Sequence, residues 1–203
     1  ALVRHEIEDF WRKEHFKRGY DIVYTPHVAR IDLWKTSGHL EYYRDSMYAP
    51  MEMEGLSYQV KPMNCPGHIL MYKSQLRSYR QLPLRWAELG TVYRWERSGV
   101  LHGLSRVRGF TQDDAHIFCT EGQVQPEASN FIVMLNEVYR DFGFGEVLVK
   151  LSTRPEKRVG SDETWDKAEA GLAAQFDDLA FQTWRGLVGT VVGSQKSWSP
   201  LSN

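Results

Sequence analysis

Residues 85–120 read RWAELGTVYRWERSGVLHGLSRVRGFTQDDAHIFCT, a pattern that predicts a β-hairpin. It reads as two extended arms joined by the loop SGVLHGLSR, whose two Gly and two Ser residues are typical of a flexible connection. Side chains in a strand alternate between its two faces. In the first arm, Arg94 and Glu96 therefore share a face. The second arm presents five different functional groups on one face: Arg108, Phe110, Gln112, Asp114 and His116.

Two interpretations of this polar face remain. It is either the solvated outer surface of a half-exposed hairpin, which is common, or the floor of a binding site. A guanidinium, an aromatic ring, an amide, a carboxylate and an imidazole side by side are more varied than a solvated surface requires. We therefore favour a site.

Composition places the chain among ordinary globular proteins. Its 203 residues, 42% hydrophobic and 25% charged, predict one large domain, or one domain with a tail, able to bury a core. The net charge of -1 gives no general attraction to nucleic acid or acidic membranes. An RNA contact would need a local basic patch such as Arg97, Arg106 and Arg108.

Cysteine usage and hydropathy bear on the compartment. Cys65 and Cys119 form no CxxC pair, which favours a reducing, cytoplasmic location, with an organelle as the alternative. No apolar run is long enough to span a membrane, so we expect no membrane partner. The charged start ALVRHEIEDFWRKEH is helical in pattern rather than a signal peptide, and we expect the chain to be a piece of a longer protein.

Periodicity predicts the remaining elements. An amphipathic helix is expected from the start, with Val3, Ile7, Phe10 and Trp11 inward, ending at Gly19. Strands are expected at about 21–25, 57–61, 90–96, 107–118 and 146–151. A helix is expected after Cys65 and before Pro83, with three inward residues (Ile69, Leu70, Leu76) and three outward ones (Lys73, Arg77, Arg80).

Two further helices are predicted in the second half of the chain. The clearest has an apolar face made of Phe131, Met134, Leu135, Val138, Tyr139 and Phe142. Its start is open, because Thr120 and Gln123 fit a capping box while Pro126 suits a first turn. We expect Gly143 and Gly145 to end it. The other helix has Ser161 or Asp162 as its N-cap.

The central stretch also resembles a known family. TVYRWE, LHGLSRVRGF and TQDDAHIFCT are similar to the second signature motif of class II aminoacyl-tRNA synthetases, and within that class to the threonyl-tRNA synthetase family. KPMNCPGH, residues 61–68, resembles a further signature of that family. The first helix, the strand at 21–25 and Pro26 resemble the first class II motif, which builds the dimer interface in the family; an ordinary surface helix and edge strand is the alternative.

The resemblance covers roughly residues 1–174 and implies an α+β fold, a mostly antiparallel sheet flanked by helices. No counterpart of the third class II motif is found, so we expect an incomplete catalytic core at 1–174 and a divergent tail at 175–203. Frame-shifted or mis-spliced translation is one hypothesis for that tail. The family's editing and anticodon-binding domains have no counterpart in these residues.

The resemblance implies a site for ATP, with Mg²⁺. Arg94 would contact the α-phosphate, Glu96 would accept from the adenine amino group, and Phe110 would stack on adenine. Arg106 would reach the γ-phosphate, and the backbone of Val107 would face the base. Gln112 would lie between the nucleotide and the amino acid, as a catalytic residue beside Arg94. His39 would take part in aminoacyl transfer to tRNA, although a histidine in a loop is otherwise a surface residue.

The resemblance also implies a zinc-assisted threonine site. Cys65 and His116 would be two zinc ligands, Asp114 would accept from the threonine hydroxyl, and Met63 would line the site. Without the family context, a buried cysteine is a small hydrophobe. The family's third ligand is a histidine beyond the third motif. None of the other six histidines stands in its place, and His68 and His102 have the pattern of loop donors, so we expect weak or absent zinc occupancy.

Three functional readings follow. The first is a threonine–tRNA ligase catalytic-domain fragment, with threonine, ATP and tRNA(Thr) as partners and a homodimer in the parent. The second is a truncated, inactive paralogue that binds an adenosine nucleotide or only dimerises. The third, a structural zinc module, is disfavoured because the candidate ligands are two, widely spaced, and without a CxxC pair.

Overall fold

The computed structural model describes residues 1–144, 153–154 and 161–178. The chain divides into two compact units, residues 1–118 (unit 1) and residues 119–203 (unit 2). Within the described residues, no helix combines the length and apolar character needed to cross a membrane.

Unit 1 is built on the antiparallel hairpin of β5 (Leu84–Tyr93) and β6 (Gly109–Phe118). Strand β1 (Asp21–Ile22) adds in parallel to β5, giving the order β1-β5-β6. This confirms the two predicted arms, but the first arm begins and ends earlier than the expected 90–96. The Glu96 amide donates to the Arg94 carbonyl at 2.9 Å, which turns the chain out of the strand after Tyr93. Strand alternation therefore does not apply to Arg94 and Glu96.

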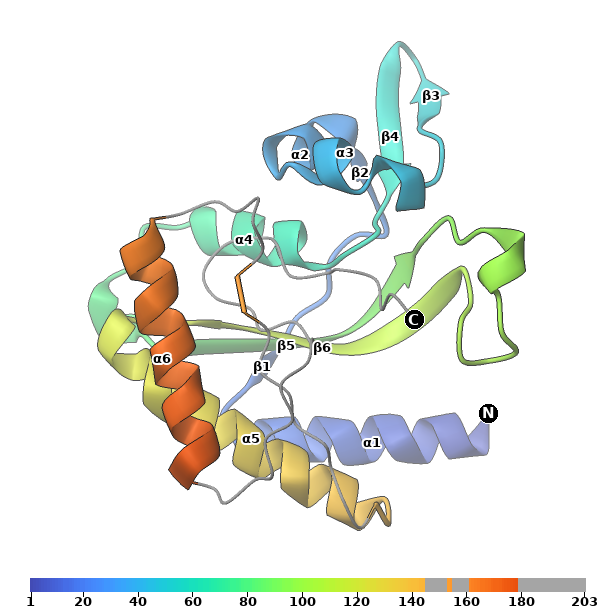
Figure 1. Cartoon of the computed structure of the whole chain (residues 1–203). Coiled ribbons are helices and arrows are strands. Elements are labelled where there is room, and N and C mark those ends of the chain that lie inside the picture. Colours follow the sequence, from blue (N-terminus) through green and yellow to red (C-terminus); the bar gives the residue numbers. More distant parts are fainter. Residues whose placement is uncertain (145–152, 155–160, 179–203) are drawn as a thin grey trace. The chain divides into compact units, whose positions relative to one another are not determined.

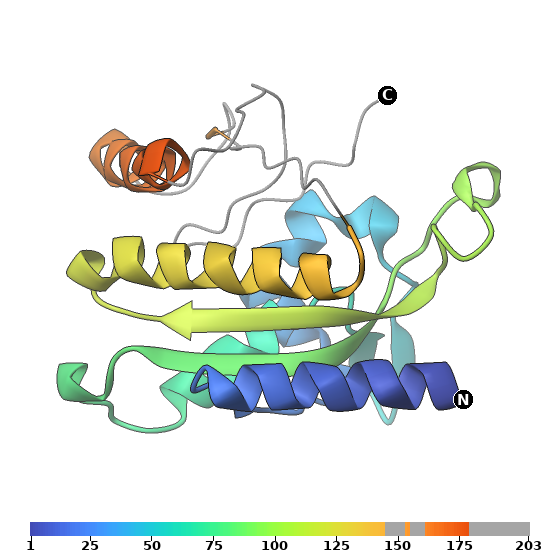
Figure 2. The same cartoon turned by 90° about the horizontal axis from the view of Figure 1, so that it is seen from below.

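Two helices cover opposite faces of this hairpin (Figure 1). Helix α1 (Leu2–Lys17) lies on one face and runs beside the hairpin in Figure 2, while α4 (Cys65–Lys73) lies on the other. The Trp11 indole on α1 donates to Asp113, whereas Asn64 at the start of α4 donates to Asp114 at 2.9 Å. Neighbouring residues of β6 thus reach opposite helices, which confirms the predicted alternation along the second arm.

Helix α1 packs through its C-terminal half. Trp11 and His15 are buried, and the chain leaves the helix through Gly19, whose φ of 75° suits a residue without a Cβ. The predicted apolar face was wrong at its N-terminal end, because Val3 is 73% and Ile7 45% exposed.

A second, smaller sheet in unit 1 has the antiparallel order β2-β4-β3. Its strands are β2 (Val28–Arg30), β3 (Met51–Met53) and β4 (Leu56–Val60), and β4 confirms the predicted strand at 57–61. Glu54 and Gly55 both have positive φ, as a two-residue hairpin turn requires. Helices α2 (Ile31–Thr36) and α3 (His39–Tyr42) accompany this sheet (Figure 1). Short 3-10 turns lie at Arg44–Ser46, Tyr79–Gln81 and Ser98–Val100.

Helix α4 differs from its prediction. It ends at Lys73, leaving Leu76 fully exposed, and Leu70 on the helix is also exposed. Arg77, expected to point outward, lies 5.1 Å from the Trp86 ring. The buried residues of α4 are Pro66 and His68, and the His68 Nε2 lies 2.8 Å from the Glu88 carboxylate.

Unit 2 contains α5 (Val124–Asp141) and α6 (Asp162–Asp178). Thr120 and Gln123 form the predicted capping box around a 3-10 turn at Glu121–Gln123, and Pro126 then lies in the first turn of α5, so both signals were right. Helix α5 is confirmed and ends before Gly143, which has φ 83°; the Gly145 prediction lies outside the described residues. Its inward face was partly wrong, because Phe131, Tyr139 and Phe142 are exposed.

Helix α6 begins where the capping pattern predicted. The Ser161 hydroxyl accepts from the Thr164 amide at 3.3 Å, as an N-cap does. Arg154 donates to Glu169 on α6 at 2.8 Å, and Lys167 pairs with Glu121 at 2.9 Å. The predicted strand at 146–151 lies outside the described residues, as do residues 179–203 of the predicted tail.

Candidate active site

One face of the β5–β6 hairpin carries the candidate residues. Residues directly opposite each other on two strands share a face. The pairs on this face are Trp86 with His116, Glu88 with Asp114, Gly90 with Gln112, and Val92 with Phe110, and we call these eight residues the hairpin floor. The floor brings together four of the predicted site residues, which confirms that they share a surface.

At one end of the floor lie the residues predicted to bind ATP. The Arg94 guanidinium lies 5.2 Å from the centre of the Phe110 ring. Its Nε donates to the Pro62 carbonyl at 3.3 Å, so the segment leading into α4 helps to hold the guanidinium in place. A fixed, planar cation beside an aromatic face suits a phosphate next to a flat base.

The loop between β5 and β6 is tied to the same end. Arg106 in the loop pairs with the Glu96 carboxylate at 3.2 Å, and Arg108 donates to the Glu96 carbonyl at 3.0 Å. Val107, between these two arginines, is half-buried. Arg106 and Glu96 thus form an ion pair with each other in this structure. For Arg106 to bind the γ-phosphate and Glu96 to bind adenine, the ion pair would have to separate.

At the other end lie the residues predicted to bind threonine and zinc. Cys65 is the first residue of α4, and burial, with a further contribution from Asp114, raises the pKa of its thiol to about 12. His116 contacts the His68 ring edge to face, with centroids 4.6 Å apart. Burial lowers the pKa of His116, which keeps the imidazole neutral. Cys65 and His116, both half-buried, thus offer a sulfur and a nitrogen donor.

These donors do not complete a metal centre. A catalytic zinc has three protein ligands as a rule. Across residues 1–144, 153–154 and 161–178, no three His, Cys, Asp or Glu side chains are arranged to hold a metal ion. The described residues thus offer the two predicted ligands, Cys65 and His116, and do not fit a full zinc site.

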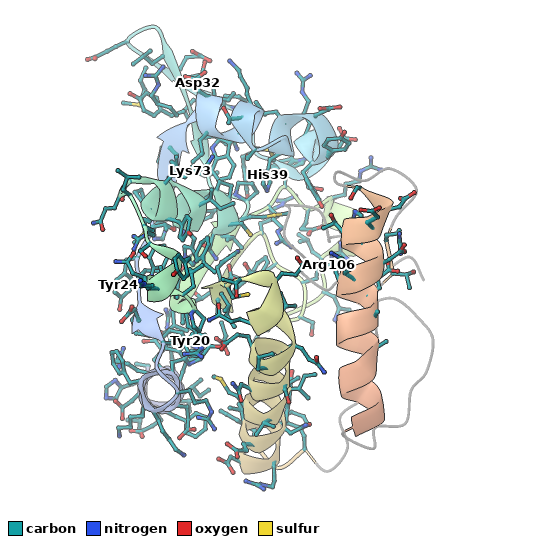
Figure 3. All side chains as sticks on the ribbon, turned by 90° about the vertical axis from the view of Figure 1, so that its left-hand side faces the viewer. Tyr20, Tyr24, Asp32, His39, Lys73 and Arg106 are labelled. Carbon is teal, nitrogen blue, oxygen red and sulfur yellow. The ribbon has the colours of Figure 1, made fainter. Side chains whose placement is uncertain are left out.

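His39 is a buried residue on α3, which overturns the alternative of a surface histidine (Figure 3). Its ring nitrogens lie 2.8 Å from the Ser37 hydroxyl and 3.1 Å from the Met63 sulfur. Burial lowers the pKa of His39 to about 4. The two predicted residues His39 and Met63 are therefore in contact.

Sequence reasoning missed the buried charged network at the centre of the floor. The Glu88 carboxylate accepts from the Thr25 amide at 3.0 Å, from Lys61 at 2.9 Å and from His68 at 2.8 Å. Burial alone would raise the pKa of Glu88, but the hydrogen bonds from His68, Thr25 and Lys61 outweigh it and lower the pKa to about 2. Glu88 is thus a carboxylate held charged inside the protein.

A signal for this network was present in the sequence. Had the first arm been extended back to Leu84, alternation would have placed Glu88 on the same face as Asp114. The interpretation of His68 as a loop donor was wrong, because His68 lies within α4 and is fully buried. His102 does lie in the loop, opposite Arg106 in an isolated bridge.

Comparison with known proteins places this hairpin in context. Residues 48–193 match the family model of the tRNA synthetase class II core domain (G, H, P, S and T). The match runs past residue 174, and the predicted boundary there stays a prediction. The chain is 61% identical over 177 residues to a threonine–tRNA ligase of Dehalococcoides mccartyi, an alignment covering 87% of this chain and 30% of the relative.

Two further comparisons agree. The chain is 57% identical over 178 residues to the chloroplastic/mitochondrial threonine–tRNA ligase 2 of Arabidopsis thaliana, covering 88% of this chain and 27% of that protein. In structure it resembles the RNA-binding domain of threonyl-tRNA synthetase from Cryptosporidium parvum, with TM-score 0.82, 42% identity, and coverage of 88% of this chain and 44% of that one. The chain spans about 30% of the length of the curated relatives it matches.

Proposed function

Because this chain belongs to the class II tRNA synthetase core family, we propose that it carries the amino-acid-activating part of a threonine–tRNA ligase. The threonine carboxylate would attack the α-phosphate of ATP and release pyrophosphate, giving threonyl-adenylate. The terminal ribose hydroxyl of tRNA(Thr) would then attack the threonyl carbonyl and release AMP. The observation that carries the proposal is the hairpin floor, where Phe110, Gln112, Asp114 and His116 lie on one face. Both steps depend on positioning, which a rigid strand pair provides, and on groups that neutralise developing charge.

The nucleotide would bind at the Phe110 end, with Mg²⁺ on its phosphates. Phe110 would stack on adenine, and Arg94 would contact the α-phosphate, where negative charge builds up in the transition state. The fixed position of Arg94 beside Phe110 supports this assignment. Glu96 and Arg106 would release each other to bind the adenine amino group and the γ-phosphate, and the Val107 backbone would face the base.

Threonine would bind at the Asp114 end, with Gln112 between the two substrates. Asp114 would accept from the threonine hydroxyl, and Met63 would line the site. A site that binds a hydroxyl in this way rejects valine by about 10⁴–10⁵-fold but serine by only about 10–200-fold. We therefore expect strong rejection of valine and weak rejection of serine.

Zinc is proposed for this site only through two ligands, Cys65 and His116. When bound, zinc would supply a Lewis-acid contact for the substrate amino and hydroxyl groups. Because the described residues do not fit a full centre, and burial raises the pKa of the Cys65 thiol that zinc would have to deprotonate, we expect weak occupancy. Competition of the chain against a zinc-chelating dye, with Cys65→Ser as the matched variant, measures this; stoichiometric, tight zinc in the unmodified chain would contradict it.

The proposal also covers transfer to tRNA and the formation of a homodimer. His39 would assist transfer to the tRNA, and its contact with Met63 supports a place at the amino-acid end. Leu2, Val3 and Ile7 are exposed on α1, which supports the proposed homodimer through the first motif. We propose a cytoplasmic or organellar location, and one relative is named as chloroplastic/mitochondrial.

Threonine-dependent exchange between ATP and pyrophosphate tests the proposal directly. We expect exchange that requires threonine and is lost in Phe110→Ala, with valine inactive. The assay is run with and without added zinc. If the folded chain shows ATP affinity but no exchange, the alternative of an inactive paralogue that binds an adenosine nucleotide replaces the proposal. If it binds neither ATP nor threonine, a role restricted to dimerisation remains.

A further inference from the structure

Asn64 and Gly90 both stand in positions where their residue type is expected to lower the stability of the fold. Gly90 lies inside β5, where glycine is entropically unfavourable and adds no packing. Asn64 is 1% exposed, and its side-chain oxygen Oδ1 is buried without a hydrogen-bond partner. A buried polar atom left unpaired is costly and calls for an explanation. Violations of this kind concentrate at functional sites.

The position of the Asn64 side chain explains the glycine at residue 90. A Cβ added to Gly90 would lie 2.5 Å from the Asn64 Oδ1 and closer still to its Cγ and Nδ2. The glycine therefore leaves the space that the Asn64 amide occupies over the floor. From there the Asn64 Nδ2 donates to the Asp114 Oδ2 at 2.9 Å.

We propose that Asn64 is a positioning residue that sets the hydroxyl specificity of this site by fixing the Asp114 carboxylate. With Oδ2 held by Asn64, Oδ1 of Asp114 is the oxygen left for a substrate hydroxyl. Asn64 touches no substrate in this proposal and acts only through Asp114. The inference rests on the proposed threonine-activating function and adds to it the residue pair that aims the specificity group.

Substitution of Asn64 gives a direct test. Affinities for the non-hydrolysable sulfamoyl analogues of threonyl- and valyl-adenylate are measured by calorimetry on the 203-residue chain and on Asn64→Ala. We expect the preference for the threonyl analogue to fall by about 10- to 100-fold, by analogy with the loss seen when a hydrogen-bond partner that orients a metal ligand is removed. An unchanged preference in Asn64→Ala would overturn the inference.

Gln59 provides a matched control in the smaller sheet. Like Asn64 it is 1% exposed and has a buried side-chain oxygen without a partner, while its Nε2 donates to the Tyr48 carbonyl at 3.0 Å. Gln59→Ala should change stability but leave the threonyl-to-valyl preference within about twofold. If both variants lower the preference equally, the effect is general loosening, and the inference is wrong.

Two measurements without ligand keep this inference separate from the proposed function. In a crystal structure of Asn64→Ala, the Asp114 carboxylate should leave its single position; a carboxylate that stays in place overturns the inference. Gly90→Ala should lower the free energy of unfolding, because its Cβ would clash with the Asn64 amide. The same substitution should cost less in a chain that already carries Asn64→Ala, where that amide is absent. If the unmodified chain binds neither analogue or shows no threonyl preference, the proposed function fails, while these two measurements still decide the role of Asn64.

Discussion

Replacing Glu88 by glutamine should remove a large part of the stability of unit 1. The Lys61 ammonium is 3% exposed and pairs with the Glu88 carboxylate at 2.9 Å. Glutamine keeps the shape but removes the charge, so Lys61 remains buried without a counter-ion. It also replaces one acceptor oxygen with an amide donor, which conflicts with donation from Lys61 or His68.

Two independent estimates give the magnitude. Breaking a buried ion pair by removing one partner costs about 3–5 kcal/mol. Lowering the pKa of Glu88 from 4.5 to about 2 corresponds to roughly 3 kcal/mol of stabilisation of the charged form. We therefore expect Glu88→Gln to lower the free energy of unfolding at pH 7 by about 3–5 kcal/mol.

The pH dependence gives the same estimate a second test. A carboxyl group with a lowered pKa stabilises the fold above its ordinary pKa of 4.5, and this stabilisation is lost as pH falls from 4.5 towards about 2. Glutamine does not titrate, so the Glu88→Gln variant lacks this pH-dependent stabilisation. Its free energy of unfolding should therefore vary less with pH between about 2 and 4.5 than that of the unmodified chain. Urea unfolding followed by circular dichroism measures both effects.

Two matched variants sharpen the test. Asp32 pairs with Arg30 and Lys35 on the surface, so Asp32→Asn should cost no more than about 1 kcal/mol. Combining Glu88→Gln with Lys61→Met should recover part of the loss, because no buried charge then lacks a partner. A loss below about 1 kcal/mol in Glu88→Gln at pH 7, or no recovery in the double variant, would refute the buried-charge reasoning.

Three further predictions concern Gly67, Arg94 and His39. Gly67→Ala should lower the urea midpoint, because an added Cβ would lie 2.7 Å from the Thr25 Cγ2 and push Thr25 from Glu88; an unchanged midpoint would show that Thr25 moves freely. Arg94→Lys keeps the charge but loses the planar fork, so we expect pyrophosphate exchange to fall by about 10²–10³-fold with little change in stability, and near-normal exchange would remove Arg94 from the α-phosphate. His39 has its pKa lowered to about 4, so it stabilises the fold above its ordinary pKa of 6.5, and this stabilisation is lost as pH falls from 6.5 towards 4. Stability measured against pH in that window should be flatter in His39→Gln than in the unmodified chain, and parallel curves would contradict the burial of His39.

The local features of the chain were predicted well where they depend on neighbouring residues. The alternation along β6 was right because the period of a strand is a property of its own backbone. The Thr120–Gln123 capping box and the Ser161 cap were right for the same reason. Predictions were wrong where they depended on which other elements a helix packs against. Leu70 and Leu76, for example, were predicted to face inward but are exposed.

The hairpin, the side chains on its second strand and the family motifs around them could be predicted from the sequence, because each depends only on residues close together in the chain. Only the tertiary structure decided which polar groups become buried together. Thr25, Lys61, His68 and Glu88 come from four separate segments, and their hydrogen bonds exist only once β1, α4 and β5 have packed. The charge on Glu88 depends on desolvation and on partners brought from far along the chain, and neither is encoded in any single stretch.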